Sequence, residues 1–189
     1  MPRVRIPEGR DPGQHVWEHL ATGITSSARA FSASVYANTR LSLREMEAAR
    51  YRIALLNGCQ ACRNWRSARD NPGYVSHAGV DASRANFRGT DTVPEGFYAA
   101  VEHWRGATLF SERERLAIEF AERFATDHLS FDTAEDFWAS LHRHFSDDEL
   151  VDLGLSVGSW VAFGRFTRVF DIDGACRVDF EPPAAAVGM

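Results

Sequence analysis

Two cysteines separated by two residues, Cys59 and Cys62, are the side chains of this sequence best suited to chemistry. They follow the dipeptide Asn57-Gly58, which is typical of a helix end because both residues adopt a left-handed backbone at little cost. If a second helix begins at Cys59, its free backbone N–H groups favour a thiolate and lower the pKa of the thiol. We therefore predict a redox dithiol in which Cys59 is the more exposed thiol and Cys62 lies one turn inside the helix.

Two other interpretations of the cysteine pair stay open. A zinc site would need two further Cys or His ligands, and Cys176 and His77 are isolated in the sequence. Two buried cysteines without reactivity are the second alternative, because free cysteine is among the most buried residue types. The redox interpretation is favoured because closely spaced cysteines in an intracellular chain are more often catalytic or metal-binding than structural.

A helix that must position the pair begins near Leu43. Ser42 and Glu45 form a capping box, in which each side chain satisfies a free backbone N–H group of the other residue. Apolar residues then recur at steps of three and four as far as Leu56, which predicts one buried stripe. The dithiol is therefore expected directly after a buried helix.

Glu47 and Arg66 are the charged residues that we expect beside the pair. Glu47 precedes Cys59 by twelve residues, about 18 Å along a straight helix, which is too far for direct contact. A reversal of the chain at Asn57-Gly58 would bring Glu47 within reach of Arg66, directly or through a water molecule. We expect these two residues to form an ion pair.

The composition predicts a single domain. With 189 residues, of which 44% are apolar and 25% charged, the chain can bury one core. Helical patterns run almost throughout, so we predict an all-α bundle. Its expected parts are an N-terminal arm at residues 1–14, the helical domain at residues 15–180 and a C-terminal tail at residues 181–189.

Start and stop signals divide the domain into helices. Asn71-Pro72-Gly73 is expected to end the helix of the cysteine pair. The other predicted helices lie within His15–Ala37 with a break near Gly23, at Asp81–Phe87, after Pro94, after Ser111, after Asp132, and from Ser146 to Phe170, with a short extended piece at Asp171–Phe180.

Three glycines lie in the apolar sequence of the last long helix, at Gly154, Gly158 and Gly164. Each costs about 1 kcal/mol relative to alanine unless close packing compensates. We predict a close helix-on-helix contact there, either within one chain or between subunits.

The charge of the chain excludes one class of function. The net charge of −5 argues against a protein that binds duplex nucleic acid, which needs a basic surface. Residues 1–14 lack the apolar core of a signal peptide. Charged residues interrupt the apolar run at Val151–Phe170, so no membrane span is expected. We predict a cytoplasmic protein with small-molecule chemistry.

The sequence around the cysteines resembles the core motif of the carboxymuconolactone decarboxylase family, in its alkylhydroperoxidase D-like branch. Similar patterns continue in the later helices, so the resemblance covers most of residues 15–170. The residues that carry it are Glu47, Arg52, the run Leu-Asn-Gly-Cys that ends at Cys59, Cys62, Ser111–Ala125 and Phe145–Phe170.

This resemblance implies an all-helical homo-oligomer, commonly a trimer or a hexamer, without a bound cofactor or metal. It implies that Cys62 attacks the O–O bond of a hydroperoxide and that Cys59 resolves the resulting sulfenic acid as a disulfide. Glu47 would relay the proton, and an external dithiol would reduce the disulfide.

Arg66 departs from the family pattern, because it stands where the family has its relay histidine. Arginine stays protonated, so it holds an anion but does not shuttle a proton. Ala61 stands where some members carry another histidine. A relay would then need an imidazole from elsewhere in the chain, and the available ones are His103, His128, His142 and His144.

Three functions are therefore weighed. The favoured one is a thiol-dependent oxidoreductase that reduces hydroperoxides, with Arg66 beside the dithiol. The second is a lyase acting on a lactone carboxylate, which Arg66 would bind through its guanidinium fork. The third is a non-enzymatic, redox-sensing oligomer.

Overall fold

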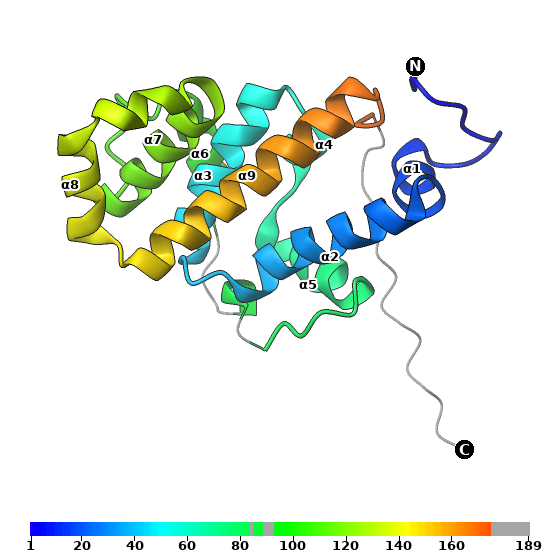
Figure 1. Cartoon of the computed structure of the whole chain (residues 1–189), viewed down its shortest axis with the longest axis horizontal. Coiled ribbons are helices and arrows are strands. Elements are labelled where there is room, and N and C mark those ends of the chain that lie inside the picture. Colours follow the sequence, from blue (N-terminus) through cyan, green and yellow to red (C-terminus); the bar gives the residue numbers. More distant parts are fainter. Residues whose placement is uncertain (84, 89–92, 175–189) are drawn as a thin grey trace.

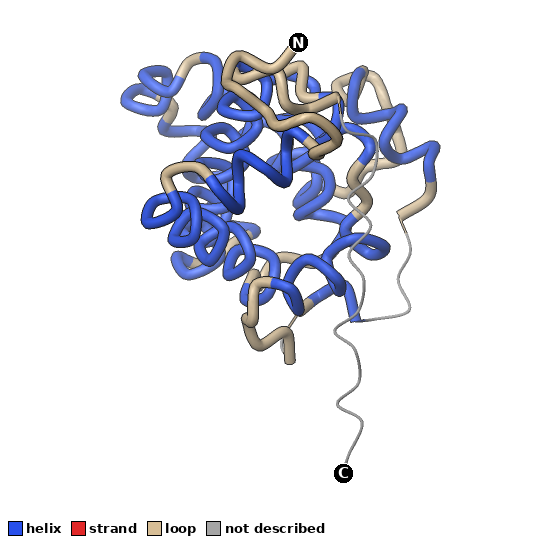
Figure 2. The backbone as a smooth tube through the Cα atoms, turned by 90° about the vertical axis from the view of Figure 1, so that its right-hand side faces the viewer, coloured by secondary structure: helices blue, strands red, loops and turns tan. Residues whose placement is uncertain are grey.

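The computed structural model describes residues 1–83, 85–88 and 93–174, and this part of the chain contains helices and no strand (Figure 1). Figure 2 shows the same chain as helices joined by loops. The prediction of an all-α fold is confirmed. The helices are α1 (Pro12–His19), α2 (Thr22–Asn38), α3 (Leu43–Asn57), α4 (Gln60–Asn64), α5 (Ser67–His77), η1 (Asn86–Arg88), α6 (Glu95–Glu102), α7 (Glu112–Thr126), η2 (His128–Thr133), α8 (Glu135–His144) and α9 (Asp147–Val169).

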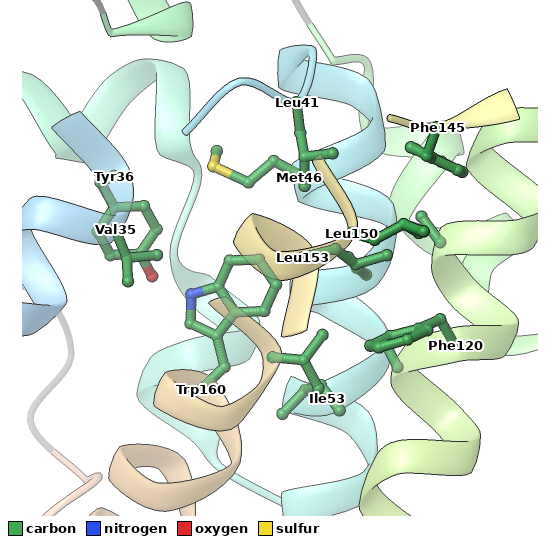
Figure 3. Close-up of a cluster of buried hydrophobic side chains, with 14 of the residues drawn as sticks. Val35, Tyr36, Leu41, Met46, Ile53, Phe120, Phe145, Leu150, Leu153 and Trp160 are labelled. Carbon is green, nitrogen blue, oxygen red and sulfur yellow. The ribbon is translucent and has the colours of Figure 1, made fainter. Parts of the chain in front are cut away.

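Helix α3 is the centre of the fold, since it packs against both α7 and α9. In Figure 1 the long helix α9 crosses the molecule, with α6, α7 and α8 toward one end and α1 toward the other. The three central helices meet in a cluster that includes Met46, Ile53, Phe120, Leu153 and Trp160 (Figure 3). The helix that leads to the cysteine pair is therefore anchored in the core.

The predicted helix starts at Ser42, Ser111 and Ser146 are confirmed. Each serine side chain accepts a hydrogen bond from the backbone N–H of the glutamate three residues later, and each glutamate side chain accepts one in return. Helix α3 ends at Gly58, whose φ of 63° lies in the left-handed region. This turn sends the chain from α3 directly into the cysteine pair.

The prediction that Asn71-Pro72-Gly73 ends the helix of the cysteines is wrong. Helix α4 ends at Asn64, because Trp65 and Arg66 have extended backbones. Pro72 lies inside the next helix, α5. Asn71 is fully buried there and accepts a hydrogen bond from the indole Nε1 of Trp65 at 2.8 Å. The tripeptide contributes to packing instead of forming a turn.

Other predicted boundaries shift by a few residues. Helix α1 starts at Pro12, inside the expected arm, and α8 is preceded by Ala134 instead of Asp132. The helix expected at Asp81–Phe87 is replaced by the single 3-10 turn η1. The predicted tail at residues 181–189, Cys176 and all but the first residues of the predicted extended piece lie outside the described residues.

The N-terminal residues pack against the end of α9. The backbone N–H of Arg3 donates to the carbonyl oxygen of Phe170 at 2.9 Å, and the amino group of Met1 contacts the carboxylate of Asp171. The first residues of the chain therefore lie beside the segment that follows α9.

The close contact predicted for the glycines of α9 occurs within the chain at Gly164. Its backbone lies against the side chain of Asn57, which ends α3. Asn57 donates to the carbonyl oxygen of Trp160 at 3.0 Å and accepts from Nε of Arg165 at 3.2 Å. These two bonds hold the amide in place, so Asn57 couples the start of the cysteine segment to α9.

Gly164→Ala is expected to lower the free energy of unfolding by about 1–3 kcal/mol, because the new methyl group would overlap the amide of Asn57. Gly158→Ala is the matched control, since its methyl group would meet the ring of Phe124 at an ordinary 3.8 Å. Urea unfolding of both variants measures the difference. Equal stabilities would contradict the tight contact at Gly164.

Candidate redox site

Cys59 and Cys62 form a disulfide at the start of α4, with their Cα atoms 5.3 Å apart. Cys59 precedes the helix, and its Sγ accepts a hydrogen bond from the backbone N–H of Cys62 at 3.2 Å. The predicted helix start at the pair is therefore correct. Helix α4 has only five residues, so its dipole favours a thiolate less than a long helix would.

The predicted exposure of the two cysteines is reversed in the structure. Cys59 is fully buried, whereas Cys62 is partly exposed. The segment after α9 contacts the residue that follows Cys59. The carboxylate of Asp173 accepts a hydrogen bond from the backbone N–H of Gln60 at 3.0 Å, and Ile172 beside it is buried. Cys62 is therefore the sulfur that a substrate reaches more easily.

Glu47 is fully buried at the centre of a hydrogen-bond network. Its carboxylate accepts from the guanidinium of Arg50, from the hydroxyl of Ser67 at 2.6 Å and from the hydroxyl of Tyr98. Burial alone would raise the pKa of Glu47, but the charge of Arg50 and these hydrogen bonds outweigh it and lower the pKa. Glu47 is therefore held as a carboxylate.

Arg50 connects this network to the cysteine helix. Its Nη1 donates to the carbonyl oxygen of Cys62 at 2.7 Å, and its Nη2 donates to that of Trp65 at 2.9 Å. The side chain is 3% exposed and pairs with Glu47 through the rest of the guanidinium. The buried ion pair thus fixes the backbone that carries Cys62.

The prediction of an ion pair between Glu47 and Arg66 is wrong. Arg66 pairs with Glu95 on α6, with two N···O distances of 2.8 Å, and its guanidinium lies 3.9 Å from the ring centre of Tyr98. The ion-pair partner of Glu47 is Arg50, because Arg50 lies about one turn further along the same helix. The hydrogen bonds to Glu95 raise the pKa of Arg66 further, so this residue stays a cation.

The other predicted residues lie away from this network. Arg52 pairs with Glu122 of α7 at 2.9 Å. The side chains that donate hydrogen bonds to the carboxylate of Glu47 are an arginine, a serine and a tyrosine, and not a histidine. Among residues 1–83, 85–88 and 93–174, no cluster of His, Cys, Asp and Glu has the arrangement of a metal site. The histidines named from the sequence follow α6 (His103), begin η2 (His128) or lie in the last turn of α8 (His142, His144).

Aromatic rings pack around Trp65, which follows the cysteine helix α4. Trp65 stacks on Tyr36 of α2, with ring centres 6.2 Å apart, and meets Tyr74 edge-on. Tyr36 also packs against Trp160 of α9, and Figure 3 shows these two rings side by side. In the described part of the chain, the amide nitrogen of Asn71 is buried without a hydrogen-bond partner. These rings form an aromatic cluster that joins Trp65, three residues after Cys62, to α2, α5 and α9.

Sequence reasoning missed three residues of the network, namely Arg50, Ser67 and Tyr98. The spacing of Arg50 to Glu47 on one helix was a usable signal, since residues three apart are neighbours on a helix surface. Ser67 and Tyr98 lie 20 and 51 residues from Glu47 in the sequence. Only the packing of α5 and α6 against α3 brings them there.

Comparison with known proteins supports the fold. A protein of unknown function from Agrobacterium tumefaciens, described as a candidate antioxidant defence protein AhpD, superposes with a TM-score of 0.64. The superposition covers 95% of this chain and all of that one, at 17% sequence identity. The chain has an AhpD-like fold. This agrees with the resemblance found in the sequence.

A sequence relative matches part of the chain. The uncharacterised protein YnjA of Escherichia coli is 36% identical over 81 residues. The match covers 42% of this chain and 43% of YnjA, which is less than half of either protein. No protein-family model matches the chain. Within the described residues, every helix is too short or too polar to span a bilayer.

Proposed function

We propose that the protein is a thiol-dependent oxidoreductase that reduces hydroperoxides through a cycle of the Cys59–Cys62 dithiol and disulfide. The observation that carries this proposal is the disulfide itself, with one sulfur partly exposed and the other buried behind it. The AhpD-like fold supports the same activity, because a structural neighbour is described as a candidate antioxidant defence protein. The cycle requires no bound cofactor or metal.

In the proposed cycle the Cys62 thiolate attacks the terminal oxygen of the hydroperoxide. The O–O bond breaks, the alkoxide takes a proton and leaves as an alcohol, and Cys62 becomes a sulfenic acid. The Cys59 thiol then attacks the sulfur of Cys62, which forms the disulfide and releases water. An external dithiol returns two electrons and two protons. The sum is one hydroperoxide and one dithiol converted to alcohol, water and one disulfide.

In this proposal Glu47 and Arg50 hold Cys62 in position and take no part in proton transfer. The carboxylate of Glu47 already accepts three side-chain donors and its pKa is lowered, which makes it a weak base. We therefore assign Glu47 the role of holding Arg50, which in turn holds the carbonyl of Cys62. Arg66 stays charged, so the proton of the thiol passes to solvent at the exposed side of Cys62.

The partners in the proposal are a small hydroperoxide and an external dithiol reductant. We also propose a cytoplasmic homo-oligomer, a trimer or hexamer, as the resemblance implies. Light scattering of the purified chain measures the assembly directly. The proposed chemistry uses neither nucleic acid nor a membrane.

A redox sensor is the second candidate function. It is favoured by Arg66, which stands in place of a relay histidine and is engaged by Glu95. A sensor would form the disulfide without sustained turnover. A lyase remains the weaker alternative, since decarboxylation has no use for two thiols and Glu95 already occupies the fork of Arg66.

The test is consumption of hydrogen peroxide and of cumene hydroperoxide with dithiothreitol as the reductant. The wild type is compared with the double variant Cys59→Ser/Cys62→Ser. We expect turnover that depends on the cysteines. Disulfide formation without turnover would favour the sensor, and no reaction of either thiol would exclude both redox functions.

A further inference from the structure

The carboxyl end of helix α4 is enclosed by three arginines. Arg50 donates to the carbonyl oxygens of Cys62 and Trp65, as described above. Arg66 donates from one Nη1 to the carbonyl oxygens of Arg63 at 2.6 Å and of Trp65 at 2.8 Å. Arg69 donates to that of Asn64 at 2.8 Å. We call these three side chains the arginine collar.

The collar satisfies the carbonyl groups that a helix end leaves without partners. The carbonyl oxygen of Ala61 accepts the backbone N–H of Trp65 at 3.1 Å, and the next four carbonyls along the chain each accept from an arginine. Helix α4 has five residues and none of them is buried. So short a helix is not stable by itself, and these bonds add contacts that hold its carboxyl end.

The arginine collar holds the backbone at the end of α4 without adding net charge there. Each arginine is paired with a carboxylate, namely Arg50 with Glu47, Arg66 with Glu95, and Arg69 with Asp70. Three positive and three negative charges lie together, so the charges within the collar and its partners cancel. The carbonyls at the end of α4 are nevertheless fixed in space.

We propose that the arginine collar positions Cys62 against Cys59, which favours closure of the disulfide over the open dithiol. A pre-oriented pair of thiols reacts as if at high effective concentration. Arg66 is accordingly a positioning residue. The biological role of this positioning rests on the proposed function. The equilibrium between dithiol and disulfide is nevertheless measured without peroxide.

The experiment is equilibration of the full-length protein with reduced and oxidised glutathione, followed by quantification of the Cys59–Cys62 disulfide. Arg66→Met and the double variant Arg66→Met/Arg69→Met are expected to lower the equilibrium constant for disulfide formation about tenfold, which corresponds to about 30 mV. Arg66→Lys retains one donor group and is expected to recover part of the loss.

Arg115→Met is the matched control, because Arg115 also donates to backbone carbonyls, those of Trp104 and Ala107, far from α4. The equilibrium constant for disulfide formation in Arg115→Met is expected to stay at the wild-type value. Arg69→Met carries the test alone if the variants of Arg66 do not fold, since its side chain is 56% exposed.

Two results would overturn the proposed role of the arginine collar. One is an unchanged equilibrium constant in the variants of Arg66 and Arg69. The other is a loss explained fully by a raised pKa of Cys62, measured by the pH dependence of alkylation, because that would assign the effect to charge. The two proposals can fail separately. If the wild type does not reduce peroxide but the arginine variants still shift the glutathione equilibrium, the proposed function is rejected and the positioning role of the arginine collar is supported.

Discussion

Glu47→Gln is expected to lower the free energy of unfolding by about 3–5 kcal/mol, the cost of breaking a buried ion pair on one side. The amide keeps the shape of the side chain but leaves the guanidinium of Arg50, which is 3% exposed, without its charge partner. Denaturant unfolding at pH 7 measures the loss. Glu119→Gln is the control, since its pair with Arg123 is partly exposed and contributes about 0.3–0.5 kcal/mol.

The same variant tests the pH dependence of stability. The pKa of Glu47 is lower in the folded protein than its ordinary value of 4.5. Its carboxylate therefore stabilises the fold above about pH 4.5, and this contribution is lost as the pH falls through the lowered folded value. The difference between wild type and Glu47→Gln should be constant at neutral pH and shrink in acid. A difference below 1 kcal/mol at pH 7 would contradict the buried pair.

Cys62→Ser is expected to reduce peroxide consumption to the rate of the uncatalysed reaction. A serine hydroxyl at this position has no activating base, whereas a thiolate attacks the O–O bond directly. Without a reductant, Cys59→Ser is expected to react once with peroxide and then to stop, because the sulfenic acid on Cys62 has no resolving thiol. Mass spectrometry detects that species as one added oxygen atom on Cys62.

These two variants also decide which sulfur reacts first. The partial exposure of Cys62 and the full burial of Cys59 favour Cys62. An added oxygen on Cys59 in the Cys62→Ser protein, at the rate seen in the wild type, would reverse the two roles. Unchanged turnover in both variants would place the chemistry elsewhere in the chain.

Local signals in the sequence were sufficient to predict the helical frame. The capping boxes at Ser42, Ser111 and Ser146 determine helix starts through contacts within four residues, and the left-handed Gly58 ends α3 in the same local way. Pro72 misled the prediction because tertiary packing tolerates a proline inside α5. Local rules therefore predict the boundaries that local contacts determine and fail where tertiary packing decides.

The candidate site was only partly predictable, because its geometry depends on contacts between distant segments. The cysteine pair and Glu47 were visible as a motif. The relative exposure of the two cysteines was not visible, since it depends on tertiary packing around Cys59, where a segment as distant in the sequence as Asp173 bonds to Gln60. The partner of Arg66 was also missed, because Glu95 approaches it only when α6 packs on α3.

The most direct test of the central claim is a single turnover without reductant. Fully reduced protein is mixed with less than one equivalent of cumene hydroperoxide, and the alcohol and the Cys59–Cys62 disulfide are quantified together. The account predicts one alcohol and one intramolecular disulfide for each hydroperoxide consumed, faster than in the Cys59→Ser/Cys62→Ser protein. Hydroperoxide lost no faster than in that variant, or disulfide formed without alcohol, would contradict it.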